Sequence, residues 1–311
     1  FPTRRSSDLV QLFNQLQTAI EEARPNQELL TRRFMDDLID RLIALAPAYN
    51  DEISPDETLL QSINNTNDCI IEFTKIAEVI SAVSSAQCAK VAYKRLERLL
   101  KYYFISPGFS GTFYRREFDY YKFITHELFV TLLAFLVQDE RWSIITDILE
   151  TELFIENPEN ASPGLFTYEY ISQNVQLLVS RNDRLHLKKI SIHADILNER
   201  HTNGTLGSAL PMSLFVETDY LLFLRSVLCD YTKENWVPWS AVYISSQRPQ
   251  YLVRLVQTKF TLQFLPVLGL KDIETLRVRL AERNHDLRSV FGFGMRRNPL
   301  AGFDLKTIAS L

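Results

Sequence analysis

The sequence FDYYKFITHELFVTLLAFLVQDERWSIITDILETELFI, residues 118–155, has the densest helical apolar pattern in the chain. From residue 121 to residue 136, apolar side chains recur at spacings of three and four, which makes a wide apolar face on a helix. The charged residues 138–141 interrupt the pattern. It then resumes at Trp142, Ile145, Ile148, Leu149 and Leu153. The segment therefore predicts two antiparallel core helices joined by a short polar turn.

Membrane insertion is the alternative explanation of so apolar a segment. The uninterrupted apolar run, residues 128–137, contains a threonine and is about ten residues long, whereas a membrane-spanning helix needs about twenty. We therefore expect the segment to be buried inside the protein, with no membrane as partner.

Helical apolar patterns continue on both sides of this segment. They occur at residues 12–20, 29–43, 59–80, 89–103, 168–179, 193–201, 212–228, 250–264 and 272–283. The chain has only 9 glycines in 311 residues and no runs that alternate as strands do. We predict an all-α fold, an irregular array of antiparallel helix hairpins that can wind into a superhelix, in one or two lobes.

Loop signals suggest where such lobes would meet. Residues 106–112, SPGFSGT, combine one proline with two glycines and mark a boundary between an N-terminal lobe, residues 10–105, and a C-terminal lobe, residues 106–311. The glycines beyond residue 288 predict a loosely ordered tail. Within residues 59–80, the run Asn64, Asn65, Thr66, Asn67 favours helix poorly, so either the helix is interrupted there or packing overrides the preference.

The composition is that of an ordinary folded protein, with 46% apolar and 23% charged residues. A net charge of -4 provides no general attraction for nucleic acid or for an anionic membrane. The cysteines, Cys69, Cys88 and Cys229, are isolated and odd in number, which is typical of buried thiols in the cytoplasm.

Residues 1–9, FPTRRSSDL, resemble one reading frame of a sequencing-adapter oligonucleotide. We interpret them as an artefact and leave them out of the fold prediction. A reading frame that runs into an adapter was cut there, so an upstream domain is expected to be missing. A natural basic N-terminal tail is the alternative interpretation.

The motif Arg181-Asn182-x-x-x-His186 is the strongest candidate for chemistry. It resembles the RNxxxH form of the motif of HEPN ribonucleases, which are all-helical and cleave RNA without a metal. The resemblance implies that His186 moves the proton of the attacking 2'-hydroxyl while Arg181 stabilises charge on the phosphate. The alternative is a basic helix end in solvent, which also includes Arg184, Lys188 and Lys189.

Other candidate sites lack the necessary spacing. His193 and His201 are eight residues apart, about 12 Å along a helix, which is too far for both to bind one metal ion beside Asp195 or Glu199. His126 and Glu127 lack the second histidine of an HExxH zinc motif, and Ser110 lacks the GxSxG context of a hydrolase. We predict no metal site and no cofactor, and we expect His126 and His193 to lie in the core or at an interface.

Residues 108–130 and 187–201 are similar to the helical region behind Toll/interleukin-receptor-type effector domains in prokaryotic defence and signalling proteins. The similarity covers about residues 56–290. None of the residues of a nucleotide-hydrolysing Toll/interleukin-receptor domain is present, so no activity is implied. The resemblance implies a sensor or assembly module whose effector domain lay upstream.

The leading hypothesis is therefore a non-enzymatic helical module of a larger prokaryotic defence or signalling protein. It would bind a protein partner or drive self-association, and nucleic acid enters only in the ribonuclease alternative. The residues expected to form the binding surfaces are aromatic or basic; they are Tyr114, Arg115, Arg116, Tyr120, Tyr121, Arg184, Lys188 and Lys189.

Overall fold

The computed structural model describes residues 2–50, 52–104, 115–155, 164–229, 235–245, 247–283, 299–300 and 303–311, with side chains from residue 10 onward except at Arg115. Within these ranges the chain is mostly helical, and a two-stranded antiparallel sheet accompanies the helices. The predicted all-α fold class is therefore confirmed. The predicted loop at residues 106–112, and with it Ser110, lies outside the described residues, as does most of the tail predicted from residue 288.

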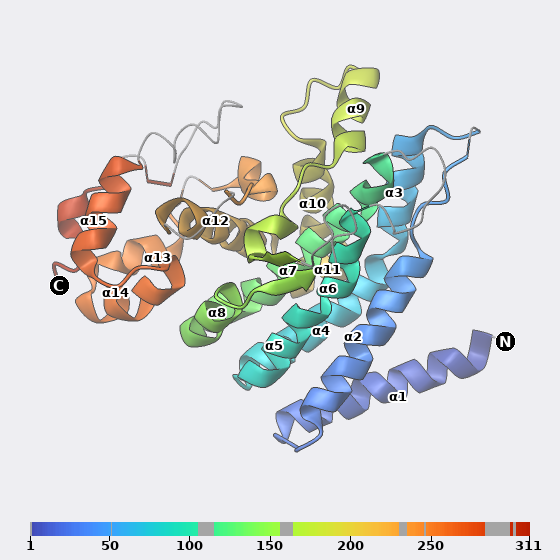
Figure 1. Cartoon of the computed structure of the whole chain (residues 1–311), viewed down its shortest axis with the longest axis horizontal. Helices are drawn as coiled ribbons and strands as arrows, with labels where there is room; N and C mark the ends of the chain where they lie inside the picture. Colours follow the sequence, from blue (N-terminus) through green and yellow to red (C-terminus); the bar gives the residue numbers. More distant parts are fainter. Residues whose placement is uncertain are drawn as a thin grey trace.

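The long helix α7 (Asp119–Gln138) lies at the centre of the fold (Figure 1). Every residue from 123 to 137 is buried, so the helix is enclosed on all sides and not only along one apolar face. α4 (Asn67–Ala82) and α12 (Met212–Leu228) pack directly against it. The buried core around α7 draws on residues from Leu16 to Ile308, and thus on almost the whole length of the chain.

In the described part of the chain, residues 116–138 are the one helical segment long and apolar enough to cross a membrane, and its most apolar 18-residue window has a mean hydropathy of 1.3. The fold buries 89% of its most apolar window among other helices. Protein therefore surrounds the apolar side chains of this helix, as in the core helix of a globular domain.

The N-terminal half stacks helices beside α7, with α2 packed against both α1 and α5 (Figure 1). Besides α4, its elements are α1 (Pro2–Glu21), α2 (Gln27–Ala44), α3 (Pro55–Asn65), α5 (Ala86–Arg95), α6 (Glu97–Leu100) and the 3-10 helix η1 (Lys101–Tyr103). α1 includes most of residues 1–9, which the sequence analysis set aside.

Thr66 separates α3 from α4, so the helix is interrupted at the asparagine-rich run. The Thr66 hydroxyl donates a hydrogen bond to the carbonyl of Ile63 at 2.6 Å and accepts one from the Arg200 guanidinium at 3.1 Å. Weak local helix preference and a contact with a distant arginine therefore act at the same residue.

The C-terminal half contains shorter elements, with 3-10 turns between helices. In chain order they are η2 (Arg115–Phe118), α8 (Trp142–Leu149), β1 (Leu153–Ile155), β2 (Gly164–Phe166), η3 (Tyr168–Ile171), α9 (Gln176–Arg184), α10 (Ile192–Thr202), α11 (Gly204–Ala209), η4 (Trp239–Tyr243), α13 (Gln250–Val253), η5 (Arg254–Val256), α14 (Thr258–Phe264), η6 (Leu265–Leu268), α15 (Ile273–Glu282) and η7 (Leu305–Thr307).

The prediction that the helix after residue 141 continues to Leu153 is wrong, because α8 ends at Leu149 and Leu153 begins β1. β1 pairs antiparallel with β2, with Leu153 opposite Phe166. The backbone N–H of Phe154 also donates to the Glu97 carboxylate at 2.6 Å. These non-local hydrogen bonds replace the helical ones.

The prediction of one helix over residues 168–179 is also wrong. A 3-10 turn, η3, is followed by a non-helical link at residues 172–175, and α9 begins at Gln176. The Ser172 hydroxyl donates to the carbonyl of Val237 at 2.6 Å, and the N–H of Leu177 donates to the Asp119 carboxylate at 2.7 Å. The Ser172 side chain and the start of α9 thus bind partners from other parts of the chain.

Residues 250–264 likewise form three short pieces, α13, η5 and α14, in place of the single helix predicted. The C-terminal segment causes the break, because the N–H groups of Ala309 and Leu311 donate to the carbonyls of Leu255 and Val256, at 2.7 and 3.0 Å. A carbonyl that accepts from this segment is drawn out of a continuous helical ladder.

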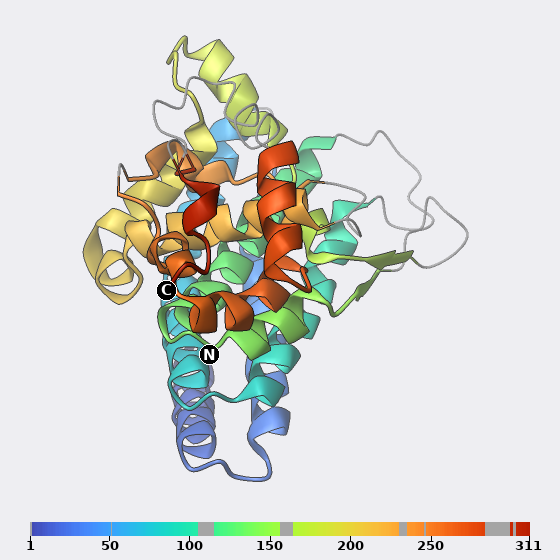
Figure 2. The same cartoon turned by 90° about the vertical axis from the view of Figure 1, so that its left-hand side faces the viewer.

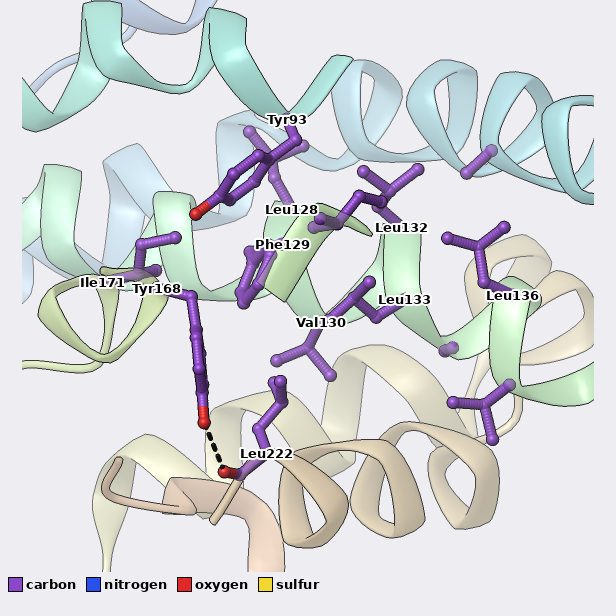
Figure 3. Close-up of a cluster of buried hydrophobic side chains, with 14 of the residues drawn as sticks. Tyr93, Leu128, Phe129, Val130, Leu132, Leu133, Leu136, Tyr168, Ile171 and Leu222 are labelled. Atoms are coloured by element: carbon purple, nitrogen blue, oxygen red, sulfur yellow. Dashed lines mark hydrogen bonds between the residues drawn. The ribbon is translucent and has the colours of Figure 1, made fainter. Parts of the chain in front are cut away.

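Phe129 occupies the middle of the core, where its ring contacts Tyr93 of α5 and Tyr168 of η3 (Figure 3). The ring centroid of Phe129 lies 5.4 Å from that of Tyr93 and 6.2 Å from that of Tyr168. Tyr168 is itself fixed, because its hydroxyl donates to the carbonyl of Leu222 at 3.0 Å (Figure 3). Side chains from both halves of the chain therefore meet at one residue of α7.

A Phe129→Ala variant is expected to lose about 3–5 kcal/mol of unfolding free energy, because the change removes a buried ring and leaves a cavity. Chemical denaturation followed by circular dichroism measures this loss. Leu262, 54% exposed on α14, provides the control: Leu262→Ala should change the free energy by less than about 1 kcal/mol. Equal losses in the two variants would contradict the central role of α7.

Candidate functional site

A pocket of about 580 Å³ lies between α9, the start of α10 and η4; we call it the α9–α10 pocket. Its lining is mainly apolar, from Val175, Leu178, Val179, Ile190, Ile192, Val237, Pro238, Trp239 and Val242. A few polar residues, Asn174, Asn182, Lys189, Ser191 and His193, complete the wall. This size and this mixture of groups are typical of pockets that bind ligands or anchor side chains.

Asp219 of α12 holds the wall of the pocket in place. Its buried carboxylate accepts hydrogen bonds from the indole N–H of Trp236 at 2.7 Å and from the backbone and hydroxyl of Ser240 at 2.8 and 2.6 Å. It also lies 3.2 Å from Nε2 of His126 on α7. Since Val237, Pro238 and Trp239 lie between these anchors, the carboxylate fixes this wall of the pocket to the core.

His193 forms the buried part of the same wall. Its ring stacks on Trp239, with centroids 5.4 Å apart, and also contacts the rings of Phe123 and His126. Neither ring nitrogen has a hydrogen-bond partner among the described residues. Burial and the neighbouring His126 hold the pKa of His193 well below its usual value of 6.5, so the imidazole is neutral at pH 7.

Exposed apolar side chains continue from the pocket along α9 and the loop that follows it. Val179, Leu185, Leu187 and Ile190 are 43%, 37%, 39% and 49% exposed; together we call them the α9 apolar strip. Val179 and Ile190 also line the pocket. Figures 1 and 2 both place α9 at the edge of the molecule. The pocket and the strip thus share two exposed apolar side chains, Val179 and Ile190.

The residues of the RNxxxH motif lie at the end of α9 and in the following loop. Arg181 donates to the carboxylates of Asp56 and Glu57 at 2.8 and 2.6 Å. Burial would raise the pKa of Asp56, but its hydrogen bonds to Arg184, Ser54 and Arg181 lower it to about 2. The charge of Arg181 is therefore balanced by carboxylates from α3.

The other two residues of the motif have different surroundings. The Asn182 amide binds the backbone of Lys189 in both directions, at 2.8 and 3.1 Å, and so closes the loop between α9 and α10. The His186 side chain is exposed and has no hydrogen bond to any described residue. Its backbone is left-handed, with φ at 50°, as is that of Lys188 at 53°.

The expected aromatic surface is only partly at the surface. Tyr120 is fully buried, and its hydroxyl donates to the carbonyl of Leu42 at 2.7 Å, so its assignment to a binding surface is wrong. Tyr121 is half-buried and stacks on Tyr102 with centroids 4.4 Å apart. Tyr114 lies outside the described residues, as does the side chain of Arg115. The guanidinium of Arg116 lies 5.6 Å from the ring centre of Tyr49.

Of the expected basic residues, Arg184 and Lys189 are paired with carboxylates. Arg184 lies 2.6 Å from the Asp56 carboxylate, and Lys189 lies 3.3 Å from that of Asp195. Lys188 is exposed and makes no ion pair with any described residue. All three border the α9 apolar strip in the sequence, and Lys188 alone of the three has no ion pair with a described residue there.

A second buried polar cluster lies under α10. The Arg200 guanidinium binds both oxygens of Glu127, at 2.8 and 3.0 Å, and Nε2 of His201 lies 3.2 Å from the same carboxylate. Burial would raise the pKa of Glu127, but Arg200 and His201 lower it to about 2. Glu127 is therefore ionised at neutral pH and fixes α10 to α7.

This cluster determines where the residues weighed as metal ligands lie. His201 faces Glu127, His193 faces Trp239, and Glu199 is exposed. The described part of the chain contains no group of three or more histidine, cysteine or acidic side chains that could hold a metal ion. Both His126 and His193 are buried, which agrees with the expectation that they lie in the core.

Sequence reasoning missed Asp219 and Arg200 as structural determinants of the site. A signal was present for Asp219, because a single carboxylate in the middle of the apolar segment 212–228 needs buried partners. The partners could not be named, because Trp236 and Ser240 approach Asp219 only after the chain has turned back on α12.

Comparison with protein-family models, curated proteins and solved structures finds no match. Neither the similarity to regions behind Toll/interleukin-receptor domains nor that to HEPN ribonucleases is tested by these comparisons, so both stay predictions. The geometry of the site is the basis for inferring function.

A His193→Phe variant should be as stable as the parent at pH 7, or more stable by about 1 kcal/mol, because it replaces unpartnered buried nitrogens by an apolar ring of similar shape. As the pH falls below 6.5, the unfolded chain takes up a proton at His193 and the folded chain does not, so the parent loses stability. The variant should lose less stability between pH 7 and pH 5 in chemical denaturation. An identical pH dependence in the two proteins would contradict a neutral buried His193; the exposed His186→Ala is the control.

The ribonuclease alternative makes a separate prediction. If His186 moves the proton, a His186→Ala variant should lose RNA cleavage by roughly a hundredfold or more, and pH 7 assays with a labelled single-stranded RNA would measure this. Unchanged cleavage, or none in the parent, would eliminate the alternative. Thermal unfolding of the parent and of His186→Ala separates lost chemistry from a damaged fold.

Proposed function

We propose that the chain is a non-enzymatic helical interaction module that binds a protein partner through the α9–α10 pocket and the α9 apolar strip. The observation that carries the proposal is the continuity of these two surfaces through Val179 and Ile190. In protein interfaces, a buried anchor side chain in a pocket dominates the affinity, and surrounding contacts exclude water from it. The pocket suits the anchor, and the strip suits the surrounding contacts.

The extent of the apolar surface favours a protein over a free small molecule. Leu185 and Leu187 do not line the pocket, yet both are exposed in the chain segment between Val179 and Ile190, which do line it. A small ligand enclosed by the pocket would leave these leucines in water, whereas a protein partner would cover them. The charge of Lys188, which makes no ion pair with any described residue, would favour an acidic rim on that partner.

The wider setting of the module is part of the same proposal. The resemblance of residues 108–130 and 187–201 to helical regions of prokaryotic defence and signalling proteins supports a sensor or assembly role in the cytoplasm. Part of the second stretch, including Leu187 and Ile190, belongs to the α9 apolar strip. The ribonuclease alternative has less support, because carboxylates of α3 already bind Arg181.

Photo-crosslinking tests the proposed surface. A benzophenone amino acid at Leu187, introduced into the chain in its native cells, is expected to crosslink to one defined protein or to a second copy of the chain. Adding Val179→Arg should reduce the yield at least tenfold, because the change places a charge in the apolar pocket. Val253, 48% exposed on α13, provides the matched control: Val253→Arg should leave the yield unchanged.

The absence of a defined crosslink at Leu187 would contradict the proposal. If Val179→Arg and Val253→Arg reduce the crosslink yield equally, the pocket is not part of the binding surface. Thermal unfolding of both variants distinguishes a lost contact from a lost fold.

A further inference from the structure

A second cavity, of about 510 Å³, lies on the other side of α10 from the α9–α10 pocket. One wall is the junction of α3 and α4, and the other is α10 with the first residues of α11. Its polar lining includes three asparagines, Asn64, Asn67 and Asn203, so we call it the asparagine groove. Ile192 lines both cavities, whereas the other residues of the α9–α10 pocket do not line the groove.

The three asparagine side chains are available to a ligand. Asn64 lies in the last turn of α3, Asn67 begins α4, and Asn203 caps the C-terminal end of α10. All three are exposed, and none makes a side-chain hydrogen bond to another described residue. Each amide offers both a carbonyl acceptor and two N–H donors. The groove therefore presents amide donors and acceptors from the α3–α4 junction and from the end of α10.

Buried hydrogen bonds join the walls that carry these amides. Arg200, at the base of the groove, binds Glu127 of α7, the carbonyl of Ile63 at 3.0 Å and the hydroxyl of Thr66 at 3.1 Å. The α3–α4 junction and α10 are thus tied together through one buried guanidinium. A site whose groups are already in position loses little ordering entropy when a ligand binds.

Within the described part of the chain, the charges in the groove leave one carboxylate without a partner. Arg181 is paired with Asp56 and Glu57, and Asp195 is paired with Lys189. Glu199 is exposed and makes no ion pair or hydrogen bond with any described residue. A ligand that fits this groove should therefore bring a positive charge to Glu199.

The groove also has apolar positions but no aromatic one among its described lining residues. The apolar residues are Leu60, Ile71, Ile192, Ile196 and Leu206. Sites for nucleic-acid bases usually provide aromatic rings for stacking, and this groove provides none. An extended peptide matches better, because its main chain alternates N–H and C=O groups and its side chains need apolar contacts.

We infer that the asparagine groove binds an extended peptide segment that carries a basic side chain, with the amides of Asn64, Asn67 and Asn203 on its main chain and Glu199 on its charge. This site is separate from the surface of the proposed function. Either could exist without the other, because the groove depends on α3, α4 and α10 and not on the α9 apolar strip.

Selection of a displayed library of random eight-residue peptides against the full chain tests the inference. Enriched peptides should contain lysine or arginine. When these peptides are synthesised and titrated by fluorescence polarisation, they should bind the double variant Asn64→Ala/Asn203→Ala about tenfold or more weakly than they bind the parent. Glu199→Gln should weaken them about two- to fivefold, and this loss should disappear when the basic residue of the peptide is replaced by methionine.

Asn65 provides the matched control, because it neighbours Asn64, is exposed and does not line the groove; Asn65→Ala should leave every affinity unchanged. Val179→Arg should also leave them unchanged, so failure of the proposed function would not affect this result. The inference is overturned if no peptide is enriched, or if the enriched peptides bind the double variant as tightly as they bind the parent. It is also overturned if the parent binds maltohexaose, the double variant does not, and peptide binding is the same in both, because this would indicate a carbohydrate site.

Discussion

The buried ion pair between Glu127 and Arg200 is the constraint on which the arrangement of this protein depends. A carboxylate inside an apolar helix is tolerated only when a cation and further hydrogen bonds compensate for the water it has lost. Arg200 donates hydrogen bonds to both carboxylate oxygens of Glu127 and to the carbonyl of Ile63 at the α3–α4 junction. Breaking such a pair by removing one partner typically costs about 3–5 kcal/mol. One interaction thus positions three elements that are distant in sequence.

The two cavities follow from two such buried carboxylates. Glu127 and its arginine lie below the asparagine groove, whereas Asp219 and its partners Trp236 and Ser240 hold one wall of the α9–α10 pocket. α10 separates the cavities, and its own position is set by Arg200 beneath it. Polar groups in the core therefore shape the surface, because each requires its partners at short range. An apolar core of the same volume would not specify these positions as narrowly.

The basic segment at the end of α9 shows how tertiary contacts change the meaning of a sequence pattern. Arg181 and Arg184 suggest an anion site when the segment is considered alone, yet Asp56 and Glu57 of α3 balance their charge. What stays exposed is the apolar strip beside them, together with Lys188. The surface that the structure offers to a partner is consequently more apolar than the segment's composition indicates.

The sequence by itself determined the helical class, the core status of residues 118–149 and the weak point at Asn64–Asn67, because these depend on local periodicity and local backbone preference. Only the tertiary structure decided that Tyr120 is buried, that residues 168–179 and 250–264 break into shorter pieces, and that Glu127 pairs with Arg200. Each of these depends on a partner far away in the chain, such as Leu42 for Tyr120 or Ala309 for Leu255. Local patterns specify which residues seek burial or hydrogen bonds, whereas the packed fold specifies which partners satisfy them.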